Sequence, residues 1–306
     1  MARKKSISAT AFKVRYLKRS RELYKRYLEA KPWLKQLYVR LLELKPEMRI
    51  VDVGCGTGDF ARRLASLVPG KCRVIGVDNR AASLRTAASE DRKAGLSGKI
   101  SYRKGDAFAL PVQDGFADLT TCRTLLIHLT EPERAVREMA RVTKPGGLVA
   151  AVEPGDMRSM YDPEDERYVE LAKKLGRAYF KGIMKLEGKD MRLGEKLPTI
   201  FRKAGLVEVA AEIQADSWMP SDPRYKLEDV KAEVQFEHSV YKDTKKIDRR
   251  YMLAGGARSS DVSELQRRYE ARVKSLLADD DKLRGSTVLY GSSLFLVVGR
   301  KPRPNS

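Results

Sequence analysis

Val51-Asp52-Val53-Gly54-Cys55-Gly56-Thr57-Gly58-Asp59-Phe60 is the stretch that decides the fold of this chain. Residues 49–53 are mostly apolar and β-branched, which favours a buried strand. Three glycines follow at alternate positions, and apolar residues at helical spacing come after them. A strand, a glycine turn and a helix in this order bring bare backbone close to a bound cofactor, because glycine has no Cβ and accepts positive φ.

The spacing of the glycines separates two kinds of cofactor. A dinucleotide fingerprint reads G-x-G-x-x-G, which would need a small residue at position 59. The chain has Asp59 there, and its third glycine comes one place early, at Gly58. A carboxylate beside a pyrophosphate would be repelled, so NAD is disfavoured.

Further strands are predicted downstream at residues 71–78, 100–107, 116–122 and 148–153, with a helix at 133–142 and a turn at 144–147. The second strand ends in Asp78, roughly 20 residues after the glycine loop. That is the separation at which a carboxylate meets ribose hydroxyls in a βαβ nucleotide site. We therefore expect Asp78 to accept hydrogen bonds from both hydroxyls of a ribose.

The run D-x-G-x-G-x-G at 52–58 resembles motif I of the class I S-adenosylmethionine-dependent methyltransferases. Residues 45–155 are similar to the small-molecule methyltransferases of the ubiquinone/menaquinone-biosynthesis type, and they include His128-Leu129 and Lys144-Pro145-Gly146-Gly147. Residues 190–215 resemble the same enzymes more loosely. The resemblance implies an α/β, Rossmann-like, seven-stranded and mostly parallel sheet. Its antiparallel seventh strand would lie between the fifth and the sixth.

The same resemblance implies S-adenosyl-L-methionine as cofactor. The glycine loop would lie against its methionine part, which carries an ammonium and a sulfonium, and the segment from Asp106 to Ala107 would meet the adenine. The cofactor-binding residues expected on this basis are Asp52, Gly54, Cys55, Gly56, Gly58, Asp78, Asn79, Asp106, Ala107 and Arg123. Arg123, at the end of the fourth strand, could instead contact an acidic acceptor.

His128 and Glu153 are the candidate catalytic residues. The ordinary pKa of histidine suits a general base, although His128 could instead cap or pack a turn. Glu153 ends the fifth strand, where it could face the acceptor or could accept hydrogen bonds from neighbouring backbone amides. The spacing of cysteine and histidine fits no metal site, so we expect no metal.

The chain is expected to divide into five parts. These are a basic helical N-terminal extension (1–45), a cofactor-binding core (46–216) with a lid-like insertion (157–190), a helical insertion (217–286), the final core strand (287–300) and a tail (301–306). Helices are predicted at 164–185, 192–204, 224–242 and 261–279. Insertions after strands five and six would lie over the carboxyl ends of the strands, where they could form the acceptor pocket and its lid. Their aromatic side chains could line that pocket or form core: Tyr161, Tyr168, Tyr179, Phe180, Trp218 and Phe236.

The net charge of +20 is concentrated at the start of the chain, where residues 1–50 hold 15 lysines and arginines against 4 glutamates. An amphipathic basic helix at 12–28 could bind phosphates or an anionic surface, or could be a solvated face. No apolar run reaches the length of a membrane span and no secretory signal is recognisable. Three cysteines make no disulfide framework. We therefore expect a cytoplasmic protein.

Three functions remain open at this point. The first is methyl transfer to a small-molecule acceptor by in-line displacement. The alternative is an RNA or ribosome-associated methyltransferase that uses the basic N-terminus, although the segment Thr121-Cys122-Arg123-Thr124 lacks the signatures of amino or cytosine-C5 methylation of nucleic acids. The third is a protein that binds S-adenosylmethionine without turnover.

Overall fold

The computed structural model describes residues 32–96, 98–156 and 159–304. The strands are β1 Arg49–Val53, β2 Arg73–Asp78, β3 Ile100–Lys104, β4 Ala117–Arg123, β5 Thr143–Pro154, β6 Ser159–Tyr161, β7 Val207–Trp218 and β8 Leu289–Arg300. The helices are α2 Pro32–Leu41, α3 Asp59–Leu67, α4 Ala81–Lys93, η1 Leu126–His128, α5 Pro132–Val142, α6 Glu166–Glu187, η2 Gly194–Lys196, α7 Leu197–Lys203, α8 Leu227–Ala254, α9 Ser259–Ala278 and α10 Asp280–Gly285.

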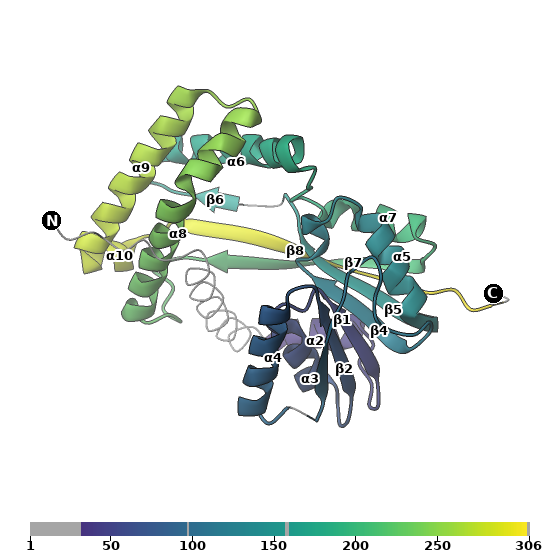
Figure 1. Ribbon diagram of the computed structural model, residues 1–306. Helices are drawn as coiled ribbons and strands as arrows, with labels where there is room; N and C mark the ends of the chain where they lie inside the picture. Colours follow the sequence, from purple (N-terminus) through teal and green to yellow (C-terminus); the bar gives the residue numbers. More distant parts are fainter. Residues whose placement is uncertain (1–31, 97, 157–158, 305–306) are drawn as a thin grey trace.

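In the described part of the chain the strands form one sheet in the order β3-β2-β1-β4-β5-β8-β6, with β7 paired to β8. Strands β1 to β5 pair in parallel. Strand β8 runs antiparallel to both β5 and β7 and separates them. The Rossmann-like fold with an antiparallel last strand between the fifth and sixth core strands is thereby confirmed, as are the helical insertions after these two strands (Figure 1).

Two details of the sheet differ from expectation. The short strand β6 was not predicted, because three residues carry no periodic signal; it forms where β8 extends past the end of β5 and offers Leu289, Tyr290 and Gly291 as partners. Strand β5 begins at Thr143, so the turn predicted at 144–147 lies inside the strand. Thr143 pairs with Ala117 and the register then shifts at 144–147, so this segment is an irregularity of the strand.

Both faces of the central strands are buried, as expected for a parallel sheet covered by helices. Alternate residues of β1 point to opposite faces: Val51 and Val53 join a core under α5 and α7, while Ile50 joins a core under α2 and α3. Asp52 shares the face of Ile50 by the same alternation. The strand therefore carries its single carboxylate into an apolar layer.

Helices α6, α8, α9 and α10 together with β6 form what we call the cap. In Figure 1 they gather around the far ends of the long β7–β8 pair, away from α3 and α4. Helix α8 runs to Ala254, well past the end predicted at residue 242. Residues 242–250 are mostly charged and lack an apolar stripe, yet lysine and arginine are good helix formers, and the turn comes only at Gly255. No helix among the described residues is both long and apolar enough for a membrane span.

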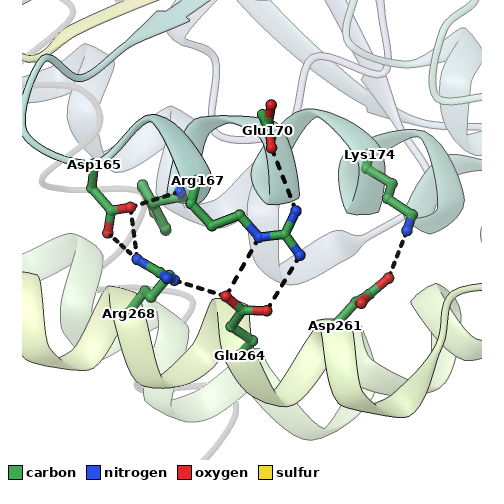
Figure 2. A network of polar contacts seen from close by, with 8 residues as sticks. Asp165, Arg167, Glu170, Lys174, Asp261, Glu264 and Arg268 are labelled. Carbon is green, nitrogen blue, oxygen red and sulfur yellow. Dashed lines mark hydrogen bonds and ion pairs between the residues drawn. The ribbon is translucent and has the colours of Figure 1, made fainter.

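An ion-pair ladder joins α6 to α9 inside the cap. Figure 2 shows its three rungs, in which Asp165 meets Arg268 at 2.8 Å, Arg167 meets Glu264 at 3.4 Å and Lys174 meets Asp261 at 2.7 Å. Most of these side chains are partly solvated, and exposed pairs typically contribute about 1 kcal/mol or less. The ladder therefore sets the register of the two helices more than it stabilises them.

Close helix packing stabilises the cap more than the ladder does, and this is testable. A Cβ added at Gly182 of α6 would overlap the carbonyl oxygen of Tyr251 in α8. We expect Gly182→Ala to lower the free energy of unfolding by about 2 kcal/mol, because the helices must separate. Glu264→Ala should lower it by less than Gly182→Ala does, because solvated ion pairs contribute little. Urea titration of both variants measures this order; a larger loss in Glu264→Ala would contradict it.

Candidate active site

The glycine loop follows β1 with three left-handed glycines: φ is +67° at Gly54, +55° at Gly56 and +81° at Gly58. A Cβ at Gly54 would lie 2.7 Å from Leu125 Cδ1, and a Cβ at Gly58 would overlap the hydroxyl of Tyr102. Positive φ and close neighbours together require glycine at both ends of the loop. The loop thus presents backbone without side chains at the carboxyl end of the sheet.

Asp78 holds this loop in place. It ends β2, is buried, and accepts a hydrogen bond from the Gly56 amide through Oδ2 at 2.9 Å. Its Oδ1 accepts from the Arg80 amide at 2.9 Å and from Arg80 Nε at 3.4 Å. A carboxylate has about four lone-pair sites, so these bonds leave room for a ribose hydroxyl. The role of Asp78 toward a ribose stays a prediction, while its link to the loop is a finding.

Arg80 is a site residue that the sequence reasoning missed. Besides bonding Asp78, it places Nη2 4.0 Å from the position of a Cβ on Gly56. The sequence signal that could have identified Arg80 is its position two residues after Asp78, which ends β2.

Asp52 is buried beneath the loop, and Oδ2 of its carboxylate has no hydrogen-bond partner among the described residues. Burial raises the pKa of Asp52 to about 8, against the opposing effects of the Ala61 amide and the guanidinium of Arg123. Arg123 ends β4 and acts electrostatically on Glu153 as well. These three residues connect the ends of β1, β4 and β5.

Glu153 braces the segment that follows β4. It is fully buried, and its Oε1 accepts hydrogen bonds from the amides of Leu125 at 2.9 Å and Leu126 at 2.8 Å. Burial raises its pKa to about 7, and the amides at the start of η1 partly offset this. Oε2 has no hydrogen-bond partner among the described residues. Of the two roles considered for Glu153, the geometry favours acceptance of turn amides.

The other candidates lie around this centre. His128 ends η1 with an exposed side chain, and its amide donates to the carbonyl of Leu125 at 2.9 Å. Asp106 is exposed and accepts from the amide of Phe108 at 2.9 Å, Ala107 is partly buried and Asn79 is exposed. Cys55 is buried in the loop, and burial raises the pKa of its thiol far above the ordinary range.

The strand order explains why these residues meet. Strands β2, β1, β4 and β5 are consecutive neighbours, so their carboxyl ends bring together the glycine loop, Asp78, Arg123 and Glu153. Asp106 lies beyond the end of β3, one strand further out. An open α/β sheet binds its ligands in the crevice at this edge.

Residues 51–151 match the family model of a methyltransferase domain. This part of the chain is a methyltransferase domain. The match runs from the middle of β1 through most of β5 and includes each candidate site residue except Glu153.

Curated relatives of the methyltransferase domain are ubiquinone/menaquinone biosynthesis C-methyltransferases UbiE. The protein of Yersinia pestis is 38% identical over 105 residues, which cover 34% of this chain and 42% of the relative. That of Vibrio vulnificus is 32% identical over 123 residues, covering 40% and 46% respectively. The chain thus spans less than half the length of these relatives.

Solved structures agree with the fold around the methyltransferase domain. A candidate methyltransferase from Bacillus halodurans superposes with a TM-score of 0.52 at 18% identity, covering 88% of this chain and 98% of that one. The YcgJ protein of Bacillus subtilis gives 0.50 at 20% identity with the same coverage. At this level of identity the likeness concerns the fold alone.

Proposed function

We propose that this protein transfers the methyl group of S-adenosylmethionine to a small-molecule acceptor held over the carboxyl ends of β4 and β5. The observation that carries the proposal is the glycine loop with its hydrogen bond to Asp78. The bare backbone of the loop and the buried carboxylate of Asp78 form a cradle, which side chains at the glycine positions would fill. The methyltransferase domain of residues 51–151 supports the same reaction.

The charges of the cradle suit this cofactor. Asp52 and Glu153 each bury a carboxylate oxygen that has no hydrogen-bond partner among the described residues. A ligand carrying an ammonium and a sulfonium would offset the cost of burying these acids. We assign the methionine part to the segment from Gly54 to Gly58, the ribose to Asp78 and Asn79, and the adenine to Asp106 and Ala107. Cys55 contributes backbone, and Arg123 balances the buried acids.

When bound, the cofactor supplies a methyl group on a sulfonium, which is already an excellent leaving group. The protein's task is to hold an acceptor atom in line and close, since proximity provides much of the rate. Glu153 would act as a positioning residue that fixes the turn carrying His128. His128 remains the candidate base for an acceptor that must lose a proton.

The first test is calorimetric titration with S-adenosylmethionine and S-adenosylhomocysteine. Wild type should bind both, and Asp78→Ala should bind at least tenfold more weakly, because it loses a ribose acceptor and frees the Gly56 amide. Asp281→Asn, which removes an exposed carboxylate on α10, is the charge-matched control and should bind like wild type. Equal affinity of Asp78→Ala and wild type would refute the assignment of Asp78.

A second readout separates an enzyme from a binding protein. Incubation with methyl-labelled cofactor and a panel of metabolites should yield labelled product with wild type. Binding without any product would favour a sensor.

No observation favours the RNA alternative. It depended on the basic helix predicted at 12–28, which lies outside the described residues, and the comparisons give no nucleic-acid enzyme among the relatives reported above.

A further inference from the structure

The cap contains a cavity of about 350 Å³ between α6, α8 and α9 and the far ends of β7 and β8. This volume is within the range of small-ligand sites. Trp218 and Tyr290 face each other across the paired strands at its base. Tyr290 lies four positions along β8 from Leu294, which pairs with Pro154 at the end of β5. At a rise of about 3.4 Å per residue, Tyr290 at the base of the cavity is roughly 14 Å beyond the end of β5.

The aromatic side chains around this cavity make it suitable for a cation. Its described walls include four aromatic rings: Tyr168, Trp218, Tyr269 and Tyr290. Trp218 and Tyr290 are 5.7 Å apart between ring centroids, in a tilted arrangement. The faces of such rings carry negative partial charge and attract organic cations. Tyr168 already makes such a cation–π contact within the protein, since the Arg272 guanidinium lies 5.6 Å from the centroid of its ring.

The charges in the walls are unequal. Glu233 and Glu237, one helical turn apart on α8, line the cavity, and Arg272 of α9 is the cation among its described lining residues. Arg272 is ion-paired with the buried carboxylate of Asp162, so its charge is already compensated. Because Asp162 compensates Arg272, the carboxylate of Glu237 gives the cavity an excess of negative charge.

Glu237 is the carboxylate whose charge is least compensated. Its side chain is accessible, yet the protein packed around it raises the pKa of its carboxyl, and no cation of the described chain opposes that shift. Burial is the main cause that raises the pKa values of Tyr269 and Tyr290, and the charge of Glu237 adds to both shifts. A carboxylate beside aromatic rings is stabilised by a cationic partner.

We infer that the cap cavity binds an organic cation, an amine or quaternary ammonium group on an apolar or aromatic body. Glu237 would neutralise its charge, and Trp218, Tyr269 and Tyr290 would enclose it. An organic anion fits poorly, because Arg272 is already held by Asp162. This site goes beyond the proposed methyl transfer and does not depend on it.

The test is calorimetric titration with two probes of the same shape, 4-hydroxyphenyl-trimethylammonium and 4-tert-butylphenol. They differ in one atom, a charged nitrogen in place of a carbon. We expect wild type to bind the ammonium at least tenfold more tightly than the neutral probe. Glu237→Gln keeps the size of the side chain and should reduce this preference to less than about threefold.

Glu228→Gln is the matched control, since it removes an exposed carboxylate from the same helix but does not line the cavity. It should retain the tenfold preference. Thermal melting of each variant establishes that it is folded. Equal binding of the two probes by wild type would overturn the inference, as would an unchanged preference in folded Glu237→Gln. Because neither probe requires S-adenosylmethionine, these results are independent of the methyltransferase assay.

Discussion

Gly58→Ala is expected to weaken binding of S-adenosylmethionine by at least a hundredfold. A non-glycine residue at φ +81° costs about 1–2 kcal/mol in backbone strain. Its Cβ would also overlap the Tyr102 hydroxyl and lie 2.9 Å from Arg62 Nη1. Arg62 cannot readily withdraw, because it is ion-paired with both Asp59 and Asp91. The loop itself must move, and the backbone surface proposed to meet the cofactor would be lost.

Two further variants isolate the cause. Gly205→Ala imposes a similar strain, at φ +84°, where an added Cβ meets nothing within 4 Å. It should lose about 1 kcal/mol of stability and bind the cofactor like wild type. Gly58→Ala combined with Tyr102→Phe removes the overlapping hydroxyl and should recover part of the affinity. Calorimetry that finds Gly58→Ala within threefold of wild type would show that the loop is no contact surface.

Glu153→Gln should change how stability depends on pH. The folded-state pKa of Glu153 is about 7, raised by burial from an ordinary 4.5. Between about pH 4.5 and pH 7 the folded state therefore binds the proton of Glu153 more tightly than the unfolded state does. The contribution of Glu153 to stability is therefore largest below about pH 4.5 and is lost as pH rises through 7. The size of the effect is on the order of 3 kcal/mol.

Urea unfolding of wild type and Glu153→Gln at pH 4.5 and pH 8 measures this effect. Glutamine keeps an oxygen acceptor for the Leu125 and Leu126 amides but does not ionise, so the variant should gain about 3 kcal/mol relative to wild type between the two pH values. Glu138→Gln is the control and should show almost no such gain, because Arg141 lowers the pKa of Glu138 and its contribution to stability is lost only below about pH 4.5. A difference between wild type and Glu153→Gln that is independent of pH would contradict the prediction.

The core of the fold was predictable because each of its strands has a local signal. The limits of β1 at residues 49 and 53 agree with the structure, since an apolar β-branched run ends in glycine. Strand β6 was not predictable, because it exists only where β8 extends beyond β5. The helix predicted at 224–242 proved longer because a charged run does not end a helix.

In the candidate site, too, the contacts that have a local sequence signal were predictable and the long-range contacts were not. The motif placed the glycine loop and Asp78 beside each other, and the Gly56 amide does bond the Asp78 carboxylate. No local pattern showed that Glu153 turns inward to the amides after β4, because both faces of β5 are buried and its alternation carries no polar signal. The contact of Tyr102 with Gly58 joins β3 to the loop after β1, and such long-range packing is not encoded by spacing.

The position of β8 has a consequence for how the protein is made. The strand nearest the C-terminus lies between β5 and β7 and pairs with both, so both have an open edge until residues 289–300 arrive. Unpaired strand edges invite association with other chains. The pairing of β8 with β5 joins residues more than a hundred positions apart, which slows folding. A nascent chain therefore makes its cap helices before residues 289–300 can close the sheet, and the edges of β5 and β7 stay open until then.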